Sequence, residues 1–192
     1  MDMDSDNLPL IMGDRAHRLM EQAAQARREG RLADAKRGWT EAVSLCRHTG
    51  SRHDLITTLK GLGQIERELQ NGDAALALYE EAVTLSLVAR EPLLLAHTIR
   101  HLGDIHLDAE RLELAERCYD EAVALYREAK QTAALDLANA IRPLAILQER
   151  KGNLEQAKSL WKQAKELYAA VDVPAGVAES SSHLAQLRLD KT

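Results

Sequence analysis

The hydrophobic residues of this chain follow a helical spacing that itself repeats about every 40 residues. In one stretch Ala75, Tyr79 and Ala82 are separated by four and three positions, which places them on one face of an α-helix. A second helical stretch precedes it, with Leu62 and Gly63 on its apolar face. No segment alternates between apolar and polar residues with a period of two, so the pattern predicts helices and no β-sheet.

An aromatic residue recurs at one position of this repeat, with an alanine four residues before it and another three residues after it. Successive copies are separated by 40, 40 and 42 residues: Trp39, Tyr79, Tyr119 and Trp161. A leucine followed by a glycine or an alanine recurs with nearly the same period, at 62–63, 102–103, 144–145 and 184–185. Such a period is typical of stacked helix pairs. We expect each ring to fill the space beside the small residue where the two helices of a pair cross.

The periodicity and the turn residues together define nine expected helices. Their expected ranges are 13–29, 32–48, 53–70, 73–89, 92–109, 112–129, 133–151, 154–170 and 174–190. Gly30, Gly72 and Gly152 fall in turns between the two helices of a pair, and Pro143 predicts a kink in the seventh helix. We expect a single domain over 13–190, preceded by a flexible segment at 1–12.

The order Leu-Gly, Ala, aromatic, Ala, as in Leu62-Gly63, Ala75, Tyr79 and Ala82, resembles the tetratricopeptide repeat (TPR). The usual unit of that family is about 34 residues. The longer unit here is similar to the repeats of kinesin light chains and of some bacterial peptide-sensing regulators. The resemblance implies an all-α, right-handed α-solenoid of four TPR-like helix pairs plus a C-terminal capping helix. It also implies a role in protein–protein interaction, although such motifs specify the fold more strongly than the function.

Composition and charge narrow the classes of partner. The net charge of −5 and the pI near 5.8 argue against nucleic-acid binding. No apolar run approaches the roughly 20 residues that a membrane-spanning helix needs. The acidic start of the chain lacks the basic flank of a signal peptide, so we expect a cytoplasmic protein. Cys46 and Cys118 fall in different repeats, so no disulfide bond between them is expected.

In the resemblance, the first helix of each pair lines a concave groove. One column of these helices reads Met20, Lys60, Arg100, Arg142 and Ser182. The groove therefore looks basic through the middle repeats and would suit an acidic or C-terminal peptide. The candidate groove residues are Lys60, Gln64, Arg67, His97, Arg100, His101, Asp104 and Arg142. A second column is expected to make one edge of the groove more polar than is usual in that family: Ala26, Glu66, His106, Gln148 and Arg188. The alternative is a solvated surface whose charges pair within the chain.

The most concentrated chemical feature is His97, His101 and Asp104, which lie on one helical face. Three potential ligands could converge on a metal there, but spacing alone is a weak signal, and neither a metal nor another cofactor is predicted. The chain has no glycine-rich phosphate loop, no serine elbow and no Cys–His pair at a meaningful spacing. We therefore predict that it is not an enzyme.

Two other functions stay open. A self-assembling structural module would associate through the ends of the solenoid, as a homo-oligomer, if the ninth helix exposes an apolar flank. A metal-binding or peptide-sensing regulatory module is the remaining interpretation. The leading prediction is a scaffold or adaptor that binds a peptide segment of another protein in its groove.

Overall fold

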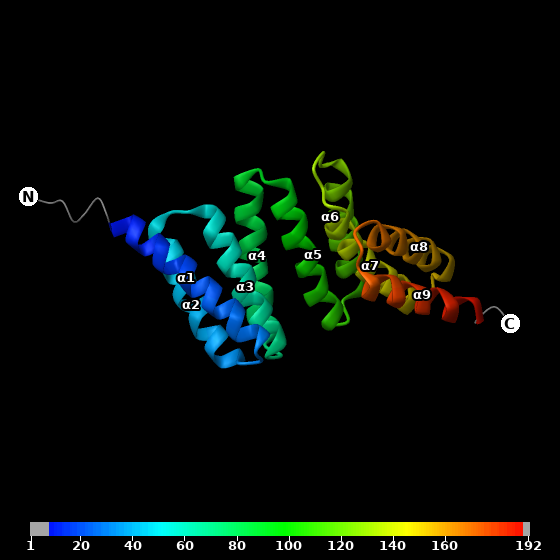
Figure 1. The fold of residues 1–192 in the computed structure, drawn as a ribbon, viewed down its shortest axis with the longest axis horizontal. Helices are drawn as coiled ribbons and strands as arrows, with labels where there is room; N and C mark the ends of the chain where they lie inside the picture. The colour runs from blue at the N-terminus through cyan, green and yellow to red at the C-terminus, as the bar shows by residue number, and fades with distance from the viewer. Residues whose placement is uncertain (1–7, 190–192) are drawn as a thin grey trace, which may run out of the picture. The chain divides into compact units, whose positions relative to one another are not determined.

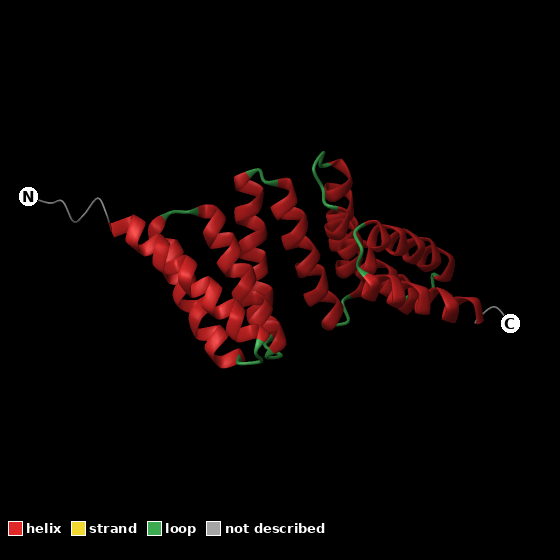
Figure 2. Ribbon diagram, viewed as in Figure 1, coloured by secondary structure: helices red, strands yellow, loops and turns green. Residues whose placement is uncertain are grey.

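The computed structural model of the protein describes residues 8–189, and these residues form helices joined by short turns (Figure 2). Within that range there are nine helices and no strand. The helices are α1 (Leu8–Arg28), α2 (Leu32–Thr49), α3 (Arg52–Glu68), α4 (Gly72–Ala89), α5 (Pro92–Asp108), α6 (Leu112–Glu128), α7 (Ala134–Arg150), α8 (Leu154–Ala170) and α9 (Pro174–Leu189). These ranges confirm the predicted helices to within two residues at every end except the first.

The start of the first helix differs from the prediction. Helix α1 begins at Leu8, five residues before the predicted start at residue 13, and the flexibility of the segment over 1–12 stays a prediction. Pro9 lies in the first turn of α1, where its missing N–H removes no hydrogen bond within the helix. Residues 1–7 and residue 190, which the predicted segment and the predicted ninth helix also include, lie outside the described residues.

The chain divides into two compact units, Met1–Glu91 and Pro92–Thr192. In the first unit α1 packs on α2, α2 on α3 and α3 on α4, and α1 also contacts α3 (Figure 1). In the second unit α5 packs on α6, α6 on α7, α7 on α8 and α8 on α9, and α5 also contacts α7. The first helices of successive pairs are thus neighbours within each unit, as the predicted TPR-like stacking requires. The single domain over 13–190 stays a prediction.

The contact that the sequence predicts at the helix crossings is present. A Cβ atom at Gly63 would lie 2.8 Å from the ring of Tyr79, and one at Gly103 would lie 2.7 Å from the ring of Tyr119. Both rings are buried, Tyr79 at 1% and Tyr119 at 0% exposure. The crossing therefore has room for the ring because the glycine has no side chain. Burial of a ring offsets the roughly 1 kcal/mol that a glycine costs inside a helix.

Aromatic rings also join one helix pair to the next, and these contacts were not predicted from the sequence. A Cβ atom at Gly61 of α3 would lie 2.7 Å from the indole of Trp39 on α2. In the second unit, a Cβ atom at Gly176 of α9 would lie 2.5 Å from the ring of Tyr168 on α8. The aromatic columns therefore hold the stacking between pairs as well as the packing within a pair.

The first helix of each of the four pairs ends with the same hydrogen-bonded turn. In the second pair the Asn71 N–H donates to the Glu66 carbonyl at 2.8 Å, and the residue before it, Gln70, has φ +63°. Gly30, Glu110 and Gly152 occupy the corresponding left-handed position in the other pairs. Gly72, which was expected in this turn, is instead the first residue of α4, so the prediction for that glycine is wrong.

Three further predictions concern the proline in α7, the two cysteines and membrane-spanning helices. Helix α7 continues through Pro143 to Arg150, and the kink at this proline stays a prediction. Cys46 and Cys118 are free thiols, and burial raises the pKa of both, that of Cys118 to about 11. Of the helices in the described part of the chain, none is both long and apolar enough to cross a membrane.

Substitution of Gly103 by alanine tests the ring contact. Gly103→Ala should lower the free energy of unfolding by about 1–3 kcal/mol, because its Cβ overlaps the Tyr119 ring. Gly13→Ala is the matched control, because nothing lies within 4 Å of a Cβ there, and it should raise stability by up to about 1 kcal/mol. Urea unfolding followed by circular dichroism measures both. Equal effects would show that the ring does not need this space.

Substitution of Gln70 by glycine tests the turn. Gln70→Gly should raise the free energy of unfolding by about 0.5 kcal/mol, because glycine adopts a positive φ without the steric cost of a side chain. Gly152→Ala should do the reverse, since Gly152 has φ +76° and open space around it, and it should cost about 1 kcal/mol. A loss of stability in Gln70→Gly, measured by urea unfolding, would contradict this account of the turn.

Candidate functional site

Four of the predicted groove residues lie together on α5: His97, Arg100, His101 and Asp104. The rings of His97 and His101 meet edge to face, with centroids 4.7 Å apart. Nη2 of Arg100 lies 2.7 Å from Nε2 of His101, and Nδ1 of His101 lies 3.1 Å from Oδ2 of Asp104. A guanidinium can only donate, so Nε2 accepts and Nδ1 of the neutral ring donates to the carboxylate. One tautomer of His101 is therefore favoured.

Helix α6 completes this hydrogen-bonded chain. The Tyr119 hydroxyl donates to Oδ1 of Asp104 at 2.9 Å, so the carboxylate accepts from both sides. The side chains of Arg100, His101 and Asp104 are 15%, 16% and 13% exposed. Burial raises the pKa of nearby Tyr126 to about 12, against the opposing effect of Arg100. The arrangement is thus only partly exposed to water, and groups of its own unit hold it in place.

These hydrogen bonds also bear on whether the histidines could bind a metal ion. Both ring nitrogens of His101 are engaged, one by Arg100 and one by Asp104. Among residues 8–189, no group of three or more His, Cys, Asp or Glu side chains is arranged to hold a metal ion. The convergence on a metal that the spacing of His97, His101 and Asp104 allows does not occur in these described helices.

Arg142 of α7 forms an ion pair with Glu179 of α9. Its Nε donates to Oε2 of Glu179 at 2.7 Å and its Nη2 donates to Oε1 at 2.5 Å. The hydrogen bond from Arg142 holds the pKa of Glu179 below its ordinary value, and the pKa of Arg142 is raised in turn. The two side chains are 41% and 32% exposed. One of the predicted basic anchors is therefore already paired within the chain.

A second polar cluster, which was not predicted from the sequence, joins α7, α8 and α9. The Trp161 Nε1–H donates to Oε1 of Glu149 at 2.5 Å, and Nδ1 of His183 lies 3.0 Å from both oxygens of Glu149. The rings of Trp161 and His183 stack with centroids 4.2 Å apart. In the repeat, His183 occupies the position of Gly61, on which Trp39 packs. The contact between Trp161 and His183 could therefore have been predicted from the contact between Trp39 and Gly61 at the same positions of the repeat.

The other three predicted groove residues lie on α3, in the first unit: Lys60, Gln64 and Arg67. Gln64 donates to Glu68 at 3.1 Å, and Arg27 of α1 donates to the same Glu68 oxygen at 2.8 Å. Burial raises the pKa of Glu68, but these hydrogen bonds hold it below its ordinary value. The carbonyl of Lys60 accepts from the Tyr79 hydroxyl at 3.3 Å. The structure therefore places the predicted residues in two sets, one in each unit.

Two residues of the column that was expected to make the groove edge polar are buried instead. Glu66 is 6% exposed and Gln148 is 0% exposed. Lys36 of α2 pairs with Glu66 at 2.8 Å, and Gln148 donates to Glu116 of α6 at 2.6 Å. Asn71 donates to Glu66 from the following turn, at 2.7 Å. These polar residues connect the end of the first helix of a pair to the preceding helix and to the turn that follows. The prediction that Glu66 and Gln148 line a polar edge of the groove is therefore wrong.

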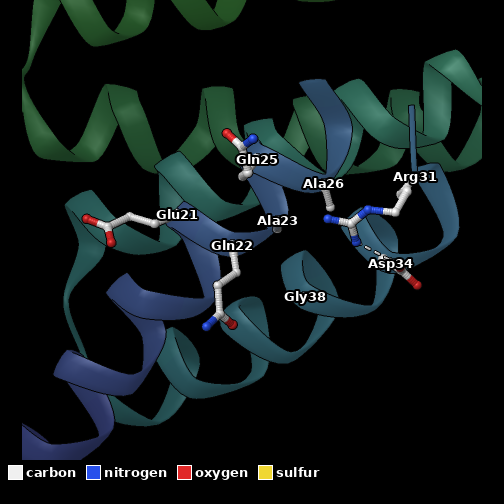
Figure 3. A pocket seen from close by; sticks show the side chains of 8 residues that line it. All are labelled: Glu21, Gln22, Ala23, Gln25, Ala26, Arg31, Asp34 and Gly38. Carbon is white, nitrogen blue, oxygen red and sulfur yellow. Dashed lines mark hydrogen bonds and ion pairs between the residues drawn. The ribbon is translucent and has the colours of Figure 1, made fainter. Parts of the chain in front are cut away.

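A cavity of about 540 Å³ lies between α1 and α2 (Figure 3), and none of the predicted groove residues lines it. Ala23, Ala26 and Gly38 are among the residues that line it, and Arg31 pairs with Asp34 beside it at 2.8 Å. In the repeat, Gln22 and Gln25 of this cavity take the places of Leu62 and Ile65. Both glutamines are exposed, so this outward face of α1 is polar at two positions where the next pair is apolar.

Helix α9 has a similar outward face. Its exposed side chains include Ala178, Ser182, Ala185 and Gln186, and its large exposed hydrophobic residue is Leu189, at 74%. In the repeat, Ser181 takes the place of Leu59, which is buried in α3. The apolar flank that end-to-end self-association would need is therefore small on this helix.

Comparison with known proteins identifies the fold. No family model and no curated protein matches the sequence. Among solved structures, the chain is similar to BtubC (BKLC) from P. vanneervenii, at 16% identity and TM-score 0.72 over 95% of this chain and 83% of that one. Nearly identical TPR-like repeats from Podosopora anserina align at 15% identity and TM-score 0.70, over 92% and 95% of the two chains.

Aspartyl phosphate phosphatase F from Bacillus subtilis aligns with TM-score 0.83 and 12% identity over 91% of this chain. The alignment spans only 45% of the phosphatase, so this chain corresponds to about half of that protein. Identities this low carry information on the fold alone. The fold is a TPR-like helical repeat, as the resemblance in the sequence implied.

The ion pair between Arg142 and Glu179 predicts a pH-dependent effect. The pKa of Glu179 is lowered in the folded state, so the pair stabilises the fold above the ordinary carboxyl pKa and is lost as the pH falls through the folded-state value. Glu179→Gln should cost no more than about 1 kcal/mol at neutral pH, since both side chains are partly exposed.

Urea unfolding of wild type and Glu179→Gln at several pH values tests this effect. The stability difference should close as the pH falls below the ordinary carboxyl pKa of about 4.3. Glu166→Gln removes an exposed carboxylate on α8 and should show no comparable gap. A Glu179→Gln difference that persists in acid would show that packing, rather than charge, holds this position.

Proposed function

We propose that this protein is an interaction scaffold that holds a polypeptide segment of a partner against the first helices of the second unit, α5, α7 and α9. The TPR-like fold supports the general role, because helical-repeat proteins bind partners on the surfaces that successive repeats build. The observation that carries the proposal is the hydrogen-bonded chain of Arg100, His101, Asp104 and Tyr119. Polar groups that are already oriented lose little conformational entropy when a partner binds.

The proposed contacts of the partner segment are the partly exposed polar side chains of this face. Arg100 and Arg142 are the anchors, with His97, His101 and Asp104 beside Arg100. Lys60, Gln64 and Arg67 are proposed as a separate set of contacts within the first unit. A guanidinium forms strong charge-assisted hydrogen bonds with carboxylates, which favours an acidic segment. Because Arg142 already pairs with Glu179, such a segment must compete with a group of the chain itself.

The proposal includes no catalytic step and no cofactor. The pKa of Cys118, raised to about 11 by burial, keeps its thiol protonated at neutral pH, and a thiol is a poor nucleophile compared with a thiolate. The free thiols are consistent with a reducing compartment, so the cytoplasm is the proposed location. Neither nucleic acid nor a membrane is among the proposed partners.

Self-assembly through the ends of the helix stack is the alternative. Gln22 and Gln25 on one outward face, and Ser181 and Ser182 on another, weigh against an apolar end-to-end contact. Light scattering over a dilution series distinguishes the two functions. A mass that rises with concentration would favour self-assembly.

The double substitution Arg100→Gln/Arg142→Gln tests the proposed face. It should weaken capture of a partner by about 100-fold or more, since each step of tenfold is about 1.4 kcal/mol and each of the two lost arginines removes a charge-assisted hydrogen bond of about 1.5–3 kcal/mol. Affinity capture from the native cell extract identifies the partner, and calorimetry with the purified partner then gives the dissociation constants.

Arg117→Gln/Lys162→Gln is the matched control, because it removes two exposed positive charges from the second helices α6 and α8. Circular dichroism must show unchanged helicity in both double variants. Undiminished capture by Arg100→Gln/Arg142→Gln, or an equal loss in the control, would rule out this face as the binding surface.

A further inference from the structure

The ion pair between α7 and α9 has the geometry of a ligand contact. Arg142 presents Nε and Nη2 to the two oxygens of Glu179, at 2.7 and 2.5 Å. This fork-to-fork arrangement is the one that arginine forms with free carboxylates and with carboxylates of partner proteins. Glu179 is 37 residues from Arg142 in the sequence, so the contact depends on the packing of α9 beside α7.

The packing of α9 does not require an acidic residue at position 179. In the repeat, the corresponding residues are Thr57, His97 and Asn139, none of which is acidic. Other contacts hold α9 in place: Gly176 lies under the ring of Tyr168, and Leu187 is 4% exposed. The carboxylate of Glu179 is therefore an addition to the helix packing, directed at Arg142.

The pair is accessible from outside. Arg142 is 41% exposed and Glu179 is 32% exposed, and ion pairs exposed to this degree contribute little to stability. Asp104 also acts on Arg142 electrostatically, but its oxygens already accept from His101 and Tyr119. Replacement of Glu179 by another carboxylate would restore the same two hydrogen bonds at small cost.

We propose that Glu179 is an internal substitute for a carboxylate of the partner, and that a carboxylate of the bound segment displaces it from Arg142. This inference rests on the proposed function, and it identifies the chemistry of the partner as a carboxylate-bearing peptide. The displaced Glu179 swings toward solvent, while α9 stays packed through Tyr168 and Leu187. Glu179 thus weakens the binding of acidic segments and limits it to those that make further contacts along the face.

Fluorescence anisotropy with a labelled, amidated hexaglutamate peptide tests the displacement. Glu179→Gln should bind this peptide about two- to fivefold more tightly than wild type, the range that an accessible ion pair represents. The control Glu166→Gln removes an equal charge from the exposed face of α8 and should bind like wild type. The gain should disappear in Arg142→Gln/Glu179→Gln, because the guanidinium that receives the carboxylate is gone.

Two further peptides identify the source of the carboxylate. A hexaglutamine peptide with a free C-terminus offers a terminal carboxylate only, and its amidated form offers none. Tighter binding of the free form by Glu179→Gln would assign Arg142 to a C-terminal carboxylate, whereas a preference for amidated hexaglutamate would assign it to acidic side chains.

An affinity of Glu179→Gln equal to that of Glu166→Gln for every peptide would overturn the displacement, and so would a gain that survives the loss of Arg142. Neither result decides the proposed function, which is judged by partner capture with the Arg100→Gln/Arg142→Gln variant. If that capture is lost while Glu179→Gln has no effect, the face binds its partner without a carboxylate exchange at Arg142.

Discussion

The fold depends on the placement of an aromatic ring against a residue that has little or no side chain. Tyr79 lies on Gly63, Tyr119 on Gly103, and Tyr168 on Gly176. Each contact lets two helices approach closely while a large apolar surface is removed from water. Since phenylalanine is absent and only six aromatic residues occur, these few rings carry much of the packing that leucine and alanine cannot supply alone.

The close packing of the helices also determines how charge is used. Polar residues at the helix ends become buried and must be paired, as Glu66 is with Lys36 and Asn71. On the first helices of the second unit, Arg100 forms an ion pair with Asp104, and Arg142 forms one with Glu179. Two basic residues of the column that looks basic in the sequence, Arg100 and Arg142, are thus paired with acidic residues of their own unit.

The sequence predicted which residues of α5 share a face, because positions 97, 101 and 104 are separated by four and three residues, about one helical turn at each step. It did not predict that Asp104 accepts from Tyr119, since that contact depends on the neighbouring helix α6. The stacking of His183 on Trp161 was accessible in principle, because position 183 corresponds to Gly61, which carries the ring of Trp39. This correspondence is hard to recognise in the sequence, because the same position of the repeat is a glycine at 61 and a histidine at 183.

The sequence by itself determined the helices, their pairing and the TPR-like fold, because the helical period and the ring and glycine columns are local and repeat along the chain. Only the tertiary structure decided the partners of the charged residues. Arg142 and Glu179 are 37 residues apart, and nothing in a helical period specifies which side chain of another helix a guanidinium will meet. The distinction is physical: backbone hydrogen bonds and face periodicity act within one helix, whereas ion pairing depends on the distances that packing sets between helices.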